Sequence, residues 1–149
     1  MEQKEQKRII WIDDDVKRAS LRPYLDELFE NGFDIEKVKN PDLIDSALSN
    51  CPDFVAIIID VLMPTGNSIG FKEANGGLWT GLIVLKRLLE DPRTSNKPLI
   101  VFTIVNDIVV KEYCKKRGIP FLNKKDYNCS SFVDKIKELI NNHKTTVES

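Results

Sequence analysis

The hydrophobic positions of this sequence fall into two alternating patterns. Short runs that are apolar along their whole length have the composition of buried strands: RIIWI at 8–12, FVAIII at 54–59 and LIVFT at 99–103. Two further strands are predicted at 33–38 and at 121–122. Because strands without polar alternation are typical of a parallel sheet that is covered on both faces, we expect helices on both sides of it.

Between these runs, apolar residues recur at the three- and four-residue spacing of amphipathic helices. A first helix is expected from about residue 20, with Pro23 in its first turn and Asn31-Gly32 as its stop. Asn40 is the expected N-cap of a second helix that ends near residue 49. Apolar residues within 82–89 mark a third helix that stops at Asp91-Pro92, a fourth is predicted at about 107–116, and those within 132–140 form the apolar face of the last helix.

A β-α unit repeated five times predicts an α/β fold with a doubly wound parallel sheet, in a single domain of 149 residues. The core is expected to span 7–142 and to be followed by a polar tail at 143–149. The segment at 65–80, TGNSIGFKEANGGLWT, is polar and rich in glycine, so we interpret it as an inserted loop. It lacks the G-x-x-x-x-G-K-[ST] pattern of a nucleotide-binding loop.

Composition and charge exclude several classes of protein. The net charge is −1 and the 22 Lys and Arg residues are scattered, which gives no nucleic-acid footprint. No apolar stretch suits a signal peptide or a membrane span, so we expect a cytoplasmic protein. Cys51, Cys114 and Cys129 lack the spacing of a zinc site or a disulfide framework, so reduced structural thiols are expected, and His143 is given no role.

Carboxylates follow two of the predicted strands. Asp13 and Asp14 come after the first strand and Asp60 after the third, so neighbouring strands would bring all three to one edge of the sheet. At about 5 Å and an effective dielectric constant near 20, each pair repels by roughly 3 kcal/mol, which the fold must offset with a cation or by neutralising one carboxyl group. The candidates are a divalent ion, Mg²⁺ rather than Zn²⁺ because the ligands are all oxygens, and Lys124 after the fifth strand. Thr103 adds a hydroxyl at another strand end.

This ordered set resembles the receiver domain of two-component response regulators, of the chemotaxis-regulator type, over about residues 7 to 142. The matching segments are IIWIDD, IIIDVLMP, LIVFT and FLNK. The resemblance implies a flavodoxin-like (βα)₅ fold with strand order 2-1-3-4-5. It also implies a phosphoprotein of phosphorelay signal transduction that is not a turnover enzyme. We expect a receiver that stands alone, because no residues remain for a DNA-binding or enzymatic output domain.

The resemblance implies a role for each matching residue. Asp60 would accept a phosphoryl group from a histidine kinase or a phosphotransfer protein, and Thr103 and Lys124 would hold the phosphoryl oxygens. Phe121 lies at the aromatic switch position. Its movement would alter the surface of the fourth helix, fifth strand and fifth helix, through which a downstream protein would bind.

The resemblance also implies a Mg²⁺ site. Its ligands would be Asp14, the Asp60 carboxylate and the backbone carbonyl of Leu62, with Asp13 acting largely through water. Metal and lysine together would offset the charge of the acidic cluster during phosphoryl transfer.

Some positions depart from the family pattern. Lys125 stands where proline usually follows the conserved lysine, so a cis peptide is not expected there. Ile104 replaces a small residue beside the phosphoryl pocket, and we expect slow dephosphorylation. About a dozen extra residues precede Gly81. They are either a tolerated insertion or a partner-selecting flap that presents Phe71 and Trp79.

Two other functions are considered. A receiver-like scaffold that is never phosphorylated would signal by protein contact alone, and the departures at Lys125 and Ile104 are compatible with it. An aspartyl-nucleophile phosphatase of the haloacid dehalogenase type needs a second Asp two residues after the first, as a general acid. Leu62 stands at that position, which argues against it.

Overall fold

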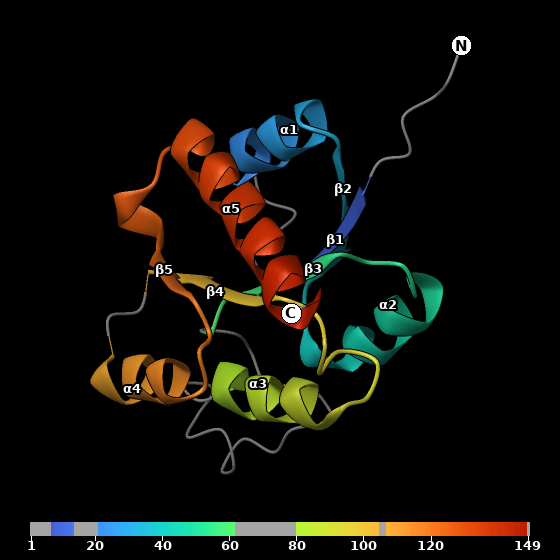
Figure 1. Cartoon of the computed structure of the whole chain (residues 1–149), viewed down its shortest axis with the longest axis vertical. Coiled ribbons are helices and arrows are strands. Elements are labelled where there is room, and N and C mark those ends of the chain that lie inside the picture. Colours follow the sequence, from blue (N-terminus) through green and yellow to red (C-terminus); the bar gives the residue numbers. More distant parts are fainter. Residues whose placement is uncertain (1–6, 14–20, 62–79, 105–106, 149) are drawn as a thin grey trace.

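The computed structural model describes residues 7–13, 21–61, 80–104 and 107–148, and these form an α/β domain around one parallel sheet (Figure 1). The strands lie in the order β2-β1-β3-β4-β5, so the predicted doubly wound, flavodoxin-like fold is confirmed. Their bounds are β1 Lys7–Ile12, β2 Phe33–Val38, β3 Ala56–Ile59, β4 Leu99–Thr103 and β5 Phe121–Asn123.

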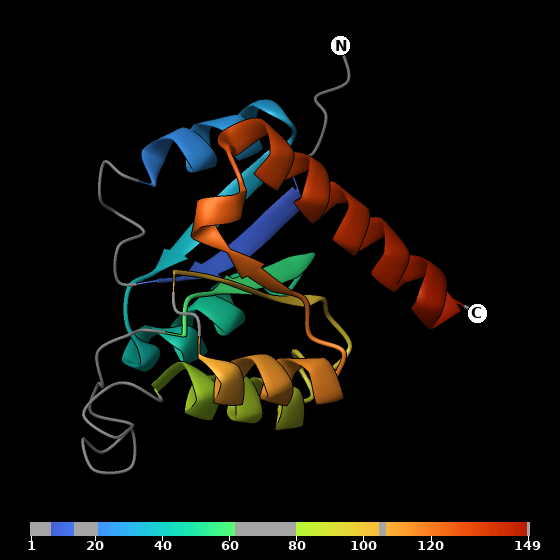
Figure 2. The same ribbon diagram turned by 90° about the vertical axis from the view of Figure 1, so that its left-hand side faces the viewer.

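The helices cover both faces of the sheet (Figure 2). α1 and α5 pack on one face, and α2, α3 and α4 pack on the other. Their bounds are α1 Arg22–Glu30, α2 Ile44–Asn50, α3 Thr80–Glu90, α4 Ile108–Lys116 and α5 Cys129–Glu148, with short 3₁₀ turns η1 at Pro41–Leu43 and η2 at Lys124–Asp126.

The predicted helix stops and caps are largely confirmed. α1 ends at Asn31-Gly32, where Gly32 adopts a φ of 89° that favours glycine. Asn40 caps the turn that it was expected to cap, with its side chain accepting a hydrogen bond from the amide of Asp42. That turn is 3₁₀, however, and the α-helix begins only at Ile44.

The structure corrects the extents predicted for the last helix and for the inserted loop. The last helix extends on both sides of its predicted apolar face at 132–140, because α5 runs from Cys129 to Glu148 and takes up most of the expected polar tail at 143–149. Thr80 belongs to α3 rather than to the inserted loop. The rest of that loop, with Phe71 and Trp79, lies outside the described residues.

The core consists of two apolar layers, one on each face of the sheet. On the α1/α5 face, Trp11, Phe102 and Phe132 are fully buried, and the Phe102 and Phe132 rings stack with centroids 4.3 Å apart. The three cysteines are free thiols, as expected, and burial raises the pKa of Cys114 to about 11 even though Arg117 opposes the shift. Within the described part of the chain, no helix has the length and hydropathy to span a membrane.

Gly81, in the first turn of α3, lies directly against the backbone that leaves β3. Its amide donates to the carbonyl of Val61 at 3.0 Å. A Cβ on Gly81 would sit 2.1 Å from the Cα of Val61, so any other residue at this position forces the backbone to shift. The residue next to Asp60 is therefore held in place by a contact that only glycine permits.

Replacing Gly81 with alanine is expected to lower the free energy of unfolding by about 3 kcal/mol or more, because backbone rather than a flexible side chain must move. Urea denaturation measures the change. Gly118→Ala is the matched control: its φ of 67° disfavours alanine, but no atom lies within 4 Å of the added Cβ. We expect it to cost only about 1 kcal/mol. Equal losses in the two variants would contradict the proposed packing.

Candidate functional site

Backbone pairing places Asp13 and Asp60 side by side at the carboxyl edge of the sheet. Ile12 and Ile59 are register partners in β1 and β3. The amide of Asp60 donates to the carbonyl of Ile12, and the amide of Asp13 donates to the carbonyl of Val38, both at 2.9 Å. Each aspartate is thus the first residue beyond its strand, fixed by one more bond of the sheet.

Strands β4 and β5 bring a hydroxyl and an ammonium group to the same place. Thr103 ends β4, and its Oγ1 donates to Oδ1 of Asp60 at 2.6 Å. Lys124 directly follows β5, and its Nζ donates to Oδ2 of Asp60 and to Oδ2 of Asp13, both at 2.8 Å. Four side chains from four strand ends therefore form one connected cluster.

The cluster is buried. Asp13 and Thr103 are fully inaccessible, Asp60 is 4% exposed and the side chain of Lys124 is 14% exposed. Burial alone lowers the pKa of Lys124, but the charges of Asp60 and Asp13 and their hydrogen bonds outweigh it, so the pKa is raised overall. The lysine therefore stays charged and serves as the counter-ion of both carboxylates.

The structure brings together Asp13, Asp60, Thr103 and Lys124, which the sequence predicted for one site. The direct bond between Asp13 and Lys124 agrees with the expectation that Lys124 offsets the acidic cluster, while the expected water-mediated role of Asp13 at Mg²⁺ stays a prediction. Asp13 and Asp60 occupy equivalent positions after adjacent strands, so one ammonium group reaches both.

Phe121, the expected switch residue, faces the side of the sheet that α2, α3 and α4 cover. It is half-buried against the α2/α3/α4 layer, with Nζ of Lys111 5.9 Å from its ring centroid. Its neighbour Leu122 packs into the opposite layer. Phe121 therefore does not touch the cluster through any contact that the described residues show.

The carboxylates at this edge of the sheet are candidate ligands for a metal ion. Two of the predicted ligands, Asp13 and Asp60, lie in the described part of the chain and adjoin each other. Asp14 and Leu62 lie outside it, and among the described residues no three acidic, Cys or His side chains form a metal-binding group. The oxygen-only chemistry of this edge fits a hard ion such as Mg²⁺.

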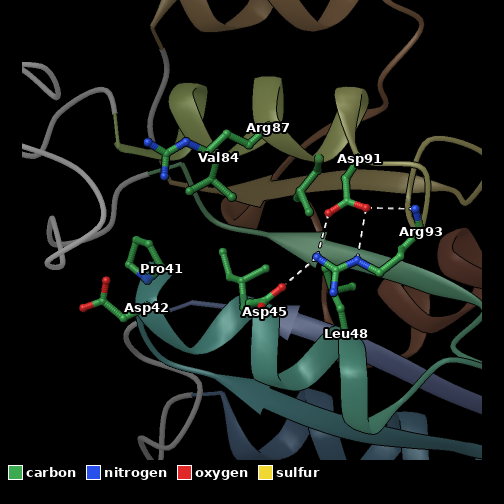
Figure 3. A pocket seen from close by; sticks show the side chains of 10 residues that line it. Pro41, Asp42, Asp45, Leu48, Val84, Arg87, Asp91 and Arg93 are labelled. Atoms are coloured by element: carbon green, nitrogen blue, oxygen red, sulfur yellow. Dashed lines mark hydrogen bonds and ion pairs between the residues drawn. The ribbon is translucent and has the colours of Figure 1, made fainter.

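A separate hollow of about 290 Å³ lies between α2 and α3 (Figure 3). Leu48, Val84 and Leu88 contribute buried apolar surface to it. Arg93 bridges the rim, donating to Asp91 at 2.8 Å and to Asp45 at 2.7 Å. These hydrogen bonds raise the pKa of Arg93, and the opposing effect of burial is smaller. The ion pairs connect α2 to the end of α3. The residues that line the hollow include no member of the carboxylate cluster.

Several solved structures share this fold. A response regulator from Desulfuromonas acetoxidans is 18% identical, with a TM-score of 0.69 over 91% of this chain and 97% of that chain. A CheY-like response regulator receiver domain protein from Methanospirillum hungatei is 18% identical, with a TM-score of 0.69 over 95% of this chain and 98% of that chain. The chemotaxis response regulator CheY4 of Vibrio cholerae is 18% identical, with a TM-score of 0.64 over 90% of this chain and 98% of that chain.

No protein-family model matches the sequence, and no curated protein matches it. At these identities the structural likeness concerns the fold. The chain has the receiver-domain fold of response regulators over nearly its whole length.

Replacing Lys124 with methionine removes the ammonium group from between two buried carboxylates. We expect the free energy of unfolding at neutral pH to fall by about 3 kcal/mol, because breaking a buried pair leaves charge uncompensated. Urea denaturation measures this loss. Lys125→Met removes an exposed neighbouring charge and is expected to change the free energy by less than about 0.5 kcal/mol.

The raised pKa of Lys124 sets the pH range of that difference. A raised folded-state pKa stabilises the protein fully below the unfolded-state value of 10.5, and the contribution is lost as the pH rises through the folded-state pKa. The gap between wild type and Lys124→Met is therefore expected to be constant from about pH 7 to about pH 9.5 and to shrink above about pH 11. A gap that closes by about pH 9 would show that the ammonium group is not held by the carboxylates.

Proposed function

We propose that this protein is a phospho-accepting receiver of a two-component or phosphorelay pathway, with Asp60 as the acceptor. The observation that carries the proposal is the contact set of one carboxylate: Oδ1 of Asp60 accepts from Thr103, and Oδ2 accepts from Lys124. Both partners are donors, as a transferred phosphoryl group requires of its surroundings. The shared fold of response regulators supports the same reading.

The chemistry is a displacement at phosphorus. A carboxylate oxygen of Asp60 attacks the phosphoryl group, the bond between phosphorus and the donor breaks, and the donor leaves with the bonding electron pair. Lys124 and Thr103 already contact Asp60 before transfer, so they lie within reach of the phosphoryl oxygens after it. Such fixed donors stabilise developing charge without reorganising.

Mg²⁺ fits this edge because every candidate ligand is an oxygen. Asp13, Asp14, Asp60 and the carbonyl of Leu62 would hold it. The ion would supply positive charge for the phosphoryl oxygens. Asp13 and Asp60 are then shared between the ion and Lys124, so the lysine is the counter-ion that keeps the metal-free cluster folded.

A protein partner is the proposed source of the phosphoryl group, a histidine kinase or a phosphotransfer protein in the cytoplasm. Three apolar side chains that follow β4 in the chain are exposed: Ile104, directly after Thr103, is 53% exposed, and Ile108 and Val109, at the start of α4, are 71% and 55% exposed. Apolar residues gathered beside a reactive edge suit a docking protein better than a small substrate. A downstream partner would bind the face of α4, β5 and α5, where a rotation of Phe121 would be felt.

The first test is chemical phosphorylation. With Mg²⁺ and a small phosphodonor such as acetyl phosphate, intact mass is expected to rise by one phosphoryl group. Asp60→Asn is expected to abolish the gain, because an amide is not a nucleophile under these conditions. Asp53→Asn, which alters an exposed aspartate before β3, is the control and keeps the gain.

The same experiment separates the alternatives. A wild-type protein that never gains mass, with either a small phosphodonor or a phosphorylated partner domain, would leave only the scaffold reading. Continuous release of inorganic phosphate over many turnovers, lost in Asp60→Asn, would indicate a phosphatase.

Ile104 is expected to lengthen the life of the phosphorylated form. It follows Thr103 directly and is half-exposed, so it is placed to obstruct an attacking water molecule. Ile104→Ala is therefore predicted to speed dephosphorylation by roughly three- to ten-fold, followed by intact mass after removal of the donor. Phe29→Ala truncates a similarly exposed apolar side chain on α1 and should leave the lifetime unchanged. An unaltered lifetime in Ile104→Ala would disprove the shielding role.

A further inference from the structure

Lys124 emerges from the least secured strand of the sheet. β5 has only three residues and lies at the edge, where it pairs with β4 alone. The last register pair is Thr103 with Asn123, and Lys124 is the next residue. The sheet therefore fixes the chain up to Asn123 but does not itself decide where the lysine points.

A side-chain hydrogen bond fixes the next step of the chain. Asn123 has extended backbone angles, and its Oδ1 accepts from the amide of Lys125 at 2.9 Å. This bond caps the 3₁₀ turn Lys124–Asp126. The donor exists because residue 125 is lysine, since proline has no amide hydrogen. Lys124 lies inside the ring that the bond closes.

The far end of the same segment is held separately. The hydroxyl of Tyr24, on α1, donates to the carbonyl of Tyr127 at 3.1 Å. Asn128 and Ser131 exchange hydrogen bonds at the start of α5, with the amide of each donating to the side chain of the other. The segment is thus held where it meets α5, and Asn123 supplies the restraint next to β5.

We propose that Asn123 is a positioning residue for Lys124. By capping the turn through the Lys125 amide, it directs the lysine side chain back over the edge of the sheet, where Nζ reaches Asp13 and Asp60 at 2.8 Å. Without the cap, the turn has other conformations in which the ammonium group points to solvent. The role of Lys124 in phosphoryl binding rests on the proposed function, whereas the effect of Asn123 on the position of Lys124 does not.

The test measures the lysine directly. Limited acetylation with the N-hydroxysuccinimide ester of acetic acid, followed by peptide mass spectrometry, gives a rate for Lys124 in the metal-free protein. The wild-type rate should be low, because Nζ is bonded twice and its side chain is only 14% exposed. In Asn123→Ala, we expect the rate at Lys124 to rise roughly three- to ten-fold, the factor that loss of a cap supplies. Asn123→Ser, whose hydroxyl also caps, should restore most of the protection.

Asn40→Ala is the matched control. Asn40 caps the other 3₁₀ turn, η1, by the same bond to the amide two residues ahead, at 3.0 Å, but it lies far along the chain from Lys124. Its loss should leave acetylation of Lys124 unchanged. Hydrogen exchange at the Lys125 amide is measured in parallel and should be faster in Asn123→Ala alone.

The outcomes are distinguishable. Faster exchange at the Lys125 amide with unchanged acetylation of Lys124 would show that the cap is only structural, and it would overturn the proposal. An equal rise in Asn40→Ala would also overturn it, because general loosening would then be the cause. Phosphorylation of Asp60 by acetyl phosphate is a separate arm and should slow in Asn123→Ala by a similar factor. If wild type is never phosphorylated, the proposed function fails while the acetylation result still decides the role of Asn123.

Discussion

The ammonium group of Lys124, held between the carboxylates of Asp13 and Asp60, is the interaction on which the site depends. Two carboxylates that are almost wholly buried need a positive group beside them, because removing a charge from water costs several kcal/mol. The lysine contacts both at 2.8 Å and is itself largely covered. A buried arrangement of this kind adds little net stability over an apolar core, so its main effect is to hold the two carboxylates in fixed positions at the edge of the sheet.

The fold is arranged to make that contact possible. A parallel sheet places the ends of all its strands at one edge, and the order β2-β1-β3-β4-β5 makes β1, β3 and β4 neighbours there. The fully apolar strand β3 is buried on both faces and paired on both sides, so the residue that follows it, Asp60, has a fixed position. The chain beyond it is constrained at once by the contact of Val61 with Gly81. Rigid elements of this kind hold a reacting group more precisely than a loop does.

Different parts of the fold were predictable to different degrees. β4 at 99–103 was predicted with the bounds that the structure shows, because an apolar run between polar residues is a local signal. β2 at 33–38 was also predicted with its observed bounds, although it is not an apolar run. The length of α5 was underestimated, since its last turns are polar and carry no apolar periodicity. His143, in this polar part of the helix, bonds to the carbonyl of Asn96 at 2.8 Å, a contact between distant residues that no local pattern indicates. Asn40 was recognised as a cap, but whether the capped turn would be 3₁₀ or α depends on packing rather than on the cap.

The sequence by itself determined which residues follow the strands, and therefore that Asp13, Asp60, Thr103 and Lys124 would meet at one edge, because strand periodicity and the β-α order are written in consecutive residues. Only the tertiary structure decided which atoms bond. The sharing of Lys124 between two carboxylates, the contact of Thr103 with one oxygen of Asp60, and the placing of Phe121 on the far side of β5 all depend on strand register and side-chain direction across residues distant in the chain. These contacts arise from the packing of the whole domain, which the local sequence pattern does not encode.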